Sequence, residues 1–183
     1  MAVVADEMFA RQGWHATTIS GVAAEAGVSP ELVSQAFGGK AGLMMAAFRH
    51  ATLGHGGTLT KAFATLDLGQ EPDPEVRLDR FVAFACSTLE RMAPLVSVLA
   101  LGADQDEELA ALVVGAEQRH AETARMALEL LASGPVPDDA VDEIYALTRA
   151  EVYLALVHQR GWTAERYRAW LRRSLLAALS PSA

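Results

Sequence analysis

The sequence has a single cysteine, Cys86, among its 183 residues. One thiol cannot form an intramolecular disulfide, and it cannot build a zinc site that uses several cysteines. The five histidines do not compensate, because no two of them are four residues apart, which is the spacing of a helical zinc pair. We therefore expect a protein of a reducing compartment that needs no metal or other cofactor.

Long hydrophobic runs are also missing. The longest strongly apolar stretch, residues 93–103, is too short to span a bilayer. The amino terminus lacks the order of a signal peptide, in which charged residues precede an apolar segment. These absences predict a soluble, cytoplasmic protein without a membrane partner.

Positive charge is scarce. The chain has 15 basic and 23 acidic side chains, a net charge of -8. Residues 1–50 hold only Arg11, Lys40 and Arg49 as basic side chains, against four acidic ones. Neutralised phosphates supply most of the non-specific affinity of proteins for DNA. The composition therefore excludes a general polyanion binder, and a DNA-binding domain here starts from a weak electrostatic base.

Catalytic motifs are not found either. The sequence has no nucleophile elbow, phosphate-binding glycine loop or dinucleotide fingerprint. Glu117-Gln118-Arg119-His120 is one copy of the Glu-x-x-His motif, whereas a di-iron bundle needs two copies and further glutamates. We predict that the protein is not an enzyme and that His120 is a core histidine or a polar group in a ligand cavity.

Helical spacing of apolar residues is abundant, and 51% of the residues are hydrophobic, so the predicted fold class is all-α. The clearest pattern covers residues 17–40. Thr18 is a candidate cap for a helix that ends at Gly27 and whose apolar residues recur at i, i+3, i+4 and i+7, namely Ile19, Val22, Ala23 and Ala26. Ser29 and Pro30 then open a second helix. Two short helices around a glycine turn indicate a helix-turn-helix.

The second helix has an apolar side that we expect to pack on its predecessor: Leu32, Val33, Ala36 and Phe37. Its other side, which a DNA groove would meet, carries Pro30, Glu31, Ser34 and Gln35.

Several spaced elements agree with one known family. They are Met8-Phe9-Ala10-Arg11-Gln12-Gly13-Trp14, Thr17-Thr18-Ile19, Ala23-Ala24-Glu25-Ala26-Gly27-Val28-Ser29 and Phe37-Gly38-Gly39-Lys40-Ala41-Gly42-Leu43. Over roughly the first quarter of the chain, the sequence resembles the N-terminal domain of TetR-family transcriptional regulators. The resemblance implies a three-helix DNA-binding domain over residues 1–47 and a helical effector-binding and dimerisation domain over residues 48–183.

The resemblance also implies a function: a bacterial, homodimeric regulator, most often a repressor, that binds a pseudo-palindromic operator and is released by a small, mostly apolar effector. By position in the family motif, the DNA contacts would come from Thr17, Thr18, Pro30, Glu31, Ser34, Gln35, Ala36 and Lys40. Both threonines and Lys40 would meet phosphate, and Gln35 is the best candidate to read a base. The family often has tyrosine at Ser34 and histidine at Ala36, so these shorter side chains should weaken binding.

Beyond residue 50 the pattern predicts helices over 73–92, 95–101 after Pro94, 107–132, 138–160 and 163–179. The family implies an effector pocket, for which the candidates are Phe81, Phe84, Met92, His120, Tyr145 and Tyr153. The last two helices are apolar on two sides, as expected of helices buried on both. Candidates for the dimer interface are Ala150, Leu154, Val157, Tyr167, Trp170, Leu171 and Leu175.

Two alternatives stay open at this point. The acidic head, which has no basic arm before its first helix, also fits a TetR-like dimeric ligand-binding or protein-interaction module that has lost DNA binding. A small helical enzyme is the third possibility, and the single Glu-x-x-His motif is its only support.

Overall fold

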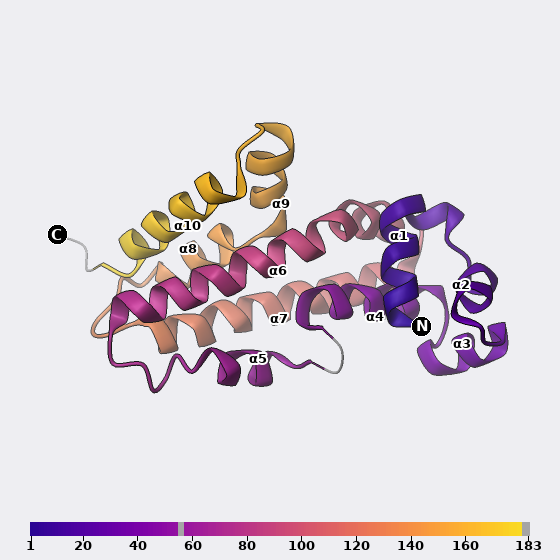
Figure 1. Ribbon diagram of the computed structural model, residues 1–183, viewed down its shortest axis with the longest axis horizontal. Helices are drawn as coiled ribbons and strands as arrows, with labels where there is room; N and C mark the ends of the chain where they lie inside the picture. Colours follow the sequence, from indigo (N-terminus) through magenta and orange to yellow (C-terminus); the bar gives the residue numbers. More distant parts are fainter. Residues whose placement is uncertain (55–56, 181–183) are drawn as a thin grey trace. The chain divides into compact units, whose positions relative to one another are not determined.

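The computed structural model describes residues 1–54 and 57–180, and within these ranges the chain forms helices and no strand. The predicted all-α class is confirmed. Figure 1 shows the elements in chain order: α1 (Ala2–Ala16), α2 (Ile19–Ala26), α3 (Pro30–Phe37), α4 (Lys40–Leu53), α5 (Leu59–Leu66), α6 (Pro74–Ala103), α7 (Glu107–Leu131), α8 (Ala140–Leu147), α9 (Ala150–Tyr153), the π-helix η1 (Leu154–Gln159) and α10 (Ala164–Ala178).

The helices form two compact units. The head unit consists of residues 1–57 and 91–116, and the body unit consists of residues 58–90 and 117–183. Both long helices, α6 and α7, therefore supply residues to each unit. The domain boundary predicted after residue 47 falls inside α4, whose last residue is Leu53.

Helix α6 corrects one prediction. The sequence pattern predicts that a helix ends at Pro94, yet α6 continues through it from Pro74 to Ala103. A proline removes one backbone hydrogen bond and crowds the preceding turn. The residues that follow it are fixed by packing instead, since Leu95, Val98 and Leu99 are buried in the head unit. By length and composition α6 is also long and apolar enough to cross a membrane, which a single helix shows only weakly, and 44% of its most apolar window is buried inside the protein.

The segment predicted as one helix over residues 138–160 is broken in three. Helix α8 ends at Leu147, Arg149 has an extended backbone (φ -71°, ψ 140°), and η1 follows α9 directly. No glycine or proline marks this break in the sequence. The side chains of Thr148 and Arg149 make non-local contacts there, described below, which a periodicity argument cannot detect. Helix α5, capped by Thr58, was also not predicted.

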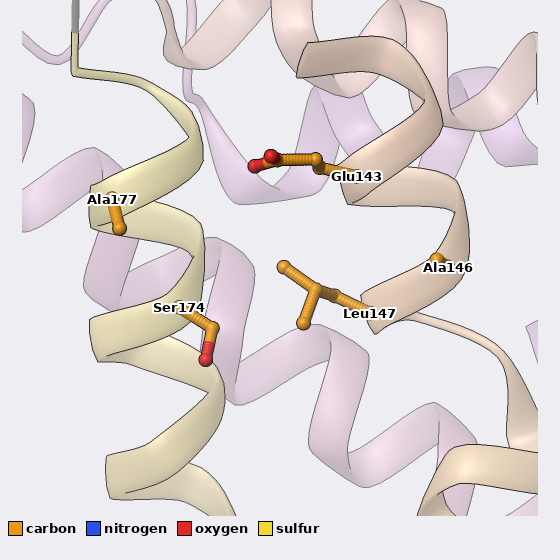
Figure 2. A pocket seen from close by; sticks show the side chains of 5 residues that line it. All are labelled: Glu143, Ala146, Leu147, Ser174 and Ala177. Carbon is orange, nitrogen blue, oxygen red and sulfur yellow. The ribbon is translucent and has the colours of Figure 1, made fainter. Parts of the chain in front are cut away.

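Within the body unit, α8 and α10 lie side by side, and an open groove runs between them (Figure 2). Its lining is mostly apolar and comes from both helices: Glu143, Ala146, Leu147, Ser174 and Ala177. Thr163 caps α10 by accepting a hydrogen bond from the Arg166 N–H, so the predicted start of this helix is confirmed.

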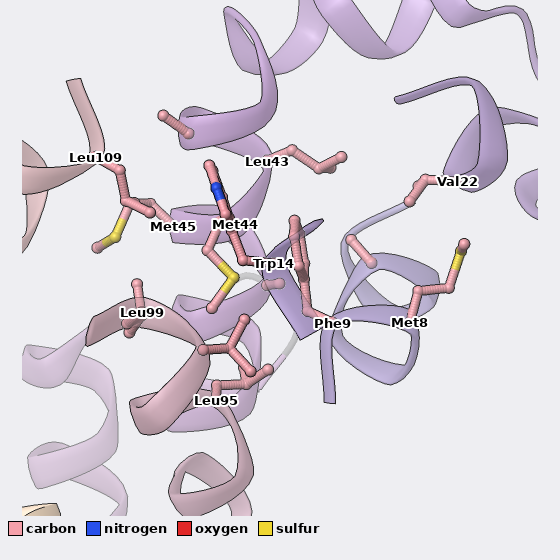
Figure 3. Close-up of a cluster of buried hydrophobic side chains, with 14 of the residues drawn as sticks. Met8, Phe9, Trp14, Val22, Leu43, Met44, Met45, Leu95, Leu99 and Leu109 are labelled. Carbon is pink, nitrogen blue, oxygen red and sulfur yellow. The ribbon is translucent and has the colours of Figure 1, made fainter. Parts of the chain in front are cut away.

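The head unit is built around helices α1 and α4, which pack together. The rings of Phe9 and Trp14 stack with centroids 5.9 Å apart. Figure 3 shows them among buried side chains of α4, α6 and α7: Leu43, Met44, Met45, Leu95, Leu99 and Leu109. Gly102 is part of this packing, because a Cβ there would lie 2.6 Å from Leu109 Cδ2 and 2.9 Å from Trp14 Cδ2.

Helices α2 and α3 have the predicted ends. The Thr18 hydroxyl accepts a hydrogen bond from the Gly21 N–H at 3.0 Å, and Gly27 ends α2 in the left-handed conformation with φ at 68°. The Ser29 hydroxyl accepts from the Leu32 N–H at 3.2 Å, with Pro30 in the first turn of α3. These caps satisfy amide groups that helix ends otherwise leave unpaired. The helix-turn-helix predicted from the sequence is confirmed.

Candidate functional site

Helix α3 is attached to the rest of the head unit by one narrow side. Val33 is fully buried and Phe37 is half-buried, and these two residues are one helical turn apart. The remaining side chains of the helix are exposed: Pro30, Glu31, Leu32, Ser34, Gln35 and Ala36. The predicted groove-facing residues are therefore together on one accessible surface, which we call the reading face.

Leu32 differs from its prediction. The sequence assigned it to the packed side of α3, but 45% of it is exposed. Ala36, one turn later, is exposed as well. Within α3 only Val33 and Phe37 are covered by the rest of the head unit. Leu32 and Ala36 are therefore part of the reading face.

Glu31 lies in the first turn of α3 and is exposed. Hydrogen bonds from its own backbone N–H and from Ser29 lower the pKa of its carboxyl group. The carboxylate form is favoured as well by the positive end of the helix dipole. Glu31 therefore presents a negative charge on the reading face at neutral pH.

The two threonines before α2 have different positions. Thr18 is exposed and caps α2, so its side chain is at the surface next to the first free amides of that helix. Thr17 is 0% exposed, and its hydroxyl donates to the Gly13 carbonyl oxygen at 2.9 Å. Thr17 was predicted to meet phosphate, whereas the structure buries it at the end of α1, where its hydroxyl holds the last turn of that helix.

Lys40 is the first residue of α4, and its ammonium nitrogen lies 4.3 Å from the centroid of the Trp14 ring. This is a cation–π contact at a half-buried position. Burial lowers the pKa of Lys40, and the negative charge of Asp106 partly opposes that shift. Trp14 therefore serves both as core residue and as a platform for the lysine predicted to meet phosphate.

The candidate effector residues are divided between the two units. Five belong to the body unit, namely Phe81, Phe84, His120, Tyr145 and Tyr153, whereas Met92 belongs to the head unit. Phe81 and Phe84 both contact the ring of Phe63 on α5, with centroids 6.4 and 5.9 Å from it. Phe63 is an aromatic residue that the sequence analysis did not single out.

His120 and Tyr145 form a second cluster at the break after α8. The His120 Nε2 atom lies 3.0 Å from Thr148 Oγ1, and the two rings of His120 and Tyr145 are 4.7 Å apart. Arg149 donates to the Tyr145 hydroxyl at 2.5 Å and pairs with Glu117 and Glu151. The cluster ties α7 to the irregular segment between α8 and α9.

Tyr167 on α10 has a buried hydroxyl that has no hydrogen-bond partner among the residues that the structure describes. Its ring meets the Tyr153 ring edge to face, with centroids 4.9 Å apart. Burial raises the pKa of both phenols, so each keeps its proton at neutral pH. Tyr167 was assigned to the dimer interface, because an apolar stripe does not distinguish a core from an interface. A buried, unpaired donor is a candidate polar contact for a ligand.

The residues predicted to form the dimer interface include fully buried and half-buried side chains. Tyr167, Leu171 and Leu175 are fully buried inside the body unit, so they support α10 from within. Leu154, Val157 and Trp170 are half-buried. Exposed apolar surface on α10 comes from Leu176, at 41%, and from its neighbour Ala177 in the groove of Figure 2.

A second open groove of the body unit is lined by α6 and α10 and is largely charged. Arg172 crosses it, with Nε 2.6 Å from an Asp79 carboxylate oxygen and a further ion pair to Glu75. Among residues 1–54 and 57–180 no group of three or more histidine, cysteine or acidic side chains is placed to hold a metal ion.

Helix α3 is exposed, is capped by Ser29 and packs on α2 through one narrow side. This arrangement is that of a helix-turn-helix motif. Residues 3–47 match the family model described as bacterial regulatory proteins, tetR family. No curated protein sequence matches the chain.

Solved structures share the whole fold. A putative TetR-family transcriptional regulator from Rhodococcus sp. has a TM-score of 0.64 at 19% identity, covering 98% of this chain and 97% of its own. The fatty acid degradation regulator FadR from Bacillus halodurans has a TM-score of 0.63 at 16% identity, covering 98% and 92%. The TetR-family regulator PfmR from Thermus thermophilus has a TM-score of 0.50 at 18% identity, covering 100% and 95%. The chain thus has the helix-turn-helix domain of the tetR family and the fold of TetR-family transcriptional regulators.

Proposed function

We propose that this protein is a cytoplasmic transcriptional regulator, acting as a repressor, that binds a pseudo-palindromic operator as a homodimer and leaves it when a small effector binds. The observation that carries the proposal is the reading face of α3. Its side chains are exposed, the buried Val33 and the half-buried Phe37 hold the helix on the head unit, and Ser29 caps its first turn. A helix held in this way can enter a major groove without losing its packing.

Gln35 is the proposed base reader. Its amide can both donate to and accept from adenine, and a good bidentate contact of this kind discriminates by about 1 to 3 kcal/mol. Glu31 can accept from cytosine, but its charge repels any phosphate near it. Thr18 and Lys40 are the proposed phosphate contacts, and Thr17 supports them from the core.

The homodimer is proposed to form through the exposed apolar surface of α8 and α10. Ala146 and Leu147 on α8, and Leu176 and Ala177 on α10, supply this surface. A two-fold dimer would present two copies of α3 to half-sites about 34 to 36 Å apart, or slightly more. In sedimentation velocity, Leu176→Glu should shift the protein to monomer, whereas Val76→Glu, a similarly exposed position of α6, should not.

The effector is proposed to bind in the body unit among Phe81, Phe84, Tyr145 and Tyr153. These side chains are aromatic and largely removed from solvent, which favours a mostly apolar molecule. An effector releases the operator only by its higher affinity for the conformation with wrongly spaced reading faces. The fold neighbour named as a fatty acid degradation regulator is consistent with an apolar effector.

The decisive experiment is the selection of duplexes from a random DNA library by the full chain, followed by fluorescence anisotropy across a range of KCl concentrations. Gln35→Ala should weaken binding to the selected duplex by about 5- to 150-fold and leave binding to random DNA unchanged. Lys40→Ala should weaken binding to both and reduce the salt dependence. Lys61→Ala removes the same charge from the body unit and is the matched control. Failure to enrich any duplex, even at low salt, would favour a dimeric ligand-binding module that does not bind DNA.

A further inference from the structure

Leu32 is an exposed leucine of the reading face, on one side of Gln35. Its side chain is 45% exposed. Its backbone is fixed, because its N–H donates to the Ser29 hydroxyl at 3.2 Å. The direction in which the side chain leaves the helix is therefore defined.

Leu32 has an amide side chain and a second apolar side chain as neighbours on the helix surface. Residues three and four positions apart are adjacent on a helix, so Leu32 lies beside Gln35 and Ala36. All three are exposed. The reading face therefore has an apolar part, made of Leu32 and Ala36, directly next to its amide, and a polar part on the other side, made of Glu31 and Ser34.

The major groove offers one apolar group for such a surface. It is the C5-methyl of thymine, which no other natural base of unmodified DNA carries. Gln35 is suited to adenine, whose partner base is thymine, so an amide and an apolar patch side by side match a half-site rich in A·T pairs. The few basic side chains of residues 1–50 supply little phosphate binding, which leaves a larger share of affinity to contacts of this kind.

We propose that Leu32, supported by Ala36, packs against a thymine methyl group in each operator half-site and makes the protein dependent on thymine at that position. This inference rests on the proposed function. It adds a specificity-determining residue that the sequence had assigned to the core.

The test replaces thymine with uracil, which removes the methyl group and leaves the hydrogen-bonding edge unchanged. Each thymine of a duplex selected by the full chain is replaced in turn, at the same position of both half-sites. One replacement should weaken binding of the wild-type protein about fourfold per half-site, as expected for about 0.8 kcal/mol per buried carbon. Leu32→Ala should bind the thymine duplex more weakly and no longer distinguish it from the uracil duplex.

Leu101→Ala is the matched control, because Leu101 is a 59% exposed leucine of the same unit, on α6. It should behave as wild type on both duplexes. Enrichment of a duplex whose binding is insensitive to uracil at every position, or a Leu32→Ala protein that stays sensitive, overturns this inference and leaves the proposed function standing. If no duplex is enriched, the proposed function itself fails, and the inference fails with it.

Discussion

His120 donates a hydrogen bond to Thr148 across 28 residues of sequence, with Nε2 3.0 Å from Oγ1. The direction follows from the threonine, whose single hydroxyl hydrogen is directed to the Ile144 carbonyl oxygen at 2.7 Å. The histidine proton on this bond is therefore carried by Nε2. The contact fixes α7 to the residue at which α8 ends.

Thr148→Val tests how much the hydrogen bond between His120 and Thr148 contributes to stability. Valine has nearly the same shape but no hydroxyl, so the half-buried Nε2–H group of His120 loses its acceptor. We expect the free energy of unfolding in urea to fall by about 1 to 3 kcal/mol. The control is Thr123→Val on α7, where the hydroxyl donates to Arg119 within the same helix, and where we expect a loss below about 0.5 kcal/mol. Equal losses in the two variants would contradict the prediction.

The stability of the protein should also depend on pH through His120. Burial, with a smaller contribution from the positive charge of Arg149, lowers the pKa of His120 below its ordinary value of 6.5, and the nearby carboxylates of Glu151 and Glu117 oppose this shift. Between the folded and unfolded pKa values the unfolded chain binds more protons than the folded one. The contribution of His120 to the free energy of unfolding is therefore fully present above pH 6.5 and is lost as the pH falls below that value.

The measurement is urea denaturation at pH 7.5 and pH 5.5 for the wild type and for His120→Gln. Glutamine keeps a hydrogen-bond donor for Thr148 but does not titrate. The variant should lose less stability than the wild type on acidification. An identical pH dependence in the two proteins would show that His120 does not contribute.

Tyr167→Phe should leave the protein as stable as the wild type or make it more stable. The hydroxyl that it removes is buried and has no hydrogen-bond partner within residues 1–54 and 57–180, and a buried polar group in that condition lowers stability. Tyr145→Phe is the contrasting variant, because the Tyr145 hydroxyl accepts from Arg149 Nη1 at 2.5 Å. We expect that variant to lose about 0.5 to 1.5 kcal/mol in thermal or urea unfolding. A clear loss for Tyr167→Phe would mean that its hydroxyl is partnered in solution.

Gly102→Ala tests the close packing of α6 in the head unit. The added methyl would lie 2.6 Å from Leu109 Cδ2 and 2.9 Å from a ring carbon of Trp14, and the stacked indole has little freedom to move. We expect a loss of about 1 to 3 kcal/mol by thermal unfolding. Gly134→Ala, where no atom lies within 4 Å of the added carbon, should be neutral. If Gly102→Ala left the stability unchanged, the side chains of Leu109 and Trp14 would be shown to move aside at little cost.

Local chemistry explains which parts of the fold the sequence could predict. Thr18, Gly27, Ser29 and Thr163 mark helix ends through hydrogen bonds with residues a few positions away, so their roles can be read without tertiary structure. At the break, Thr148 and Arg149 also contact His120 and Glu117, about thirty residues earlier. No local pattern contains that information.

The candidate site, like the fold, could be predicted from the sequence only in part. The exposure of Glu31, Ser34 and Gln35 followed from helical spacing, because polar residues occupied one side of the pattern. Leu32 and Tyr167 were misassigned for one reason: hydrophobic side chains show that something will cover them, but not whether it is the protein's own core, a second subunit or a ligand. Only the arrangement of neighbouring helices decides between these.

The composition of the head unit has a consequence for its synthesis. Its core draws on residues 1–57 and on residues 91–116, which include Leu95, Leu99 and Leu109. A ribosome makes these two stretches at different times, since translation proceeds at about 5 to 20 residues per second. The reading helix is translated before residues 91–116, so the unit that supports it cannot close its core until the chain has been extended to Ala116.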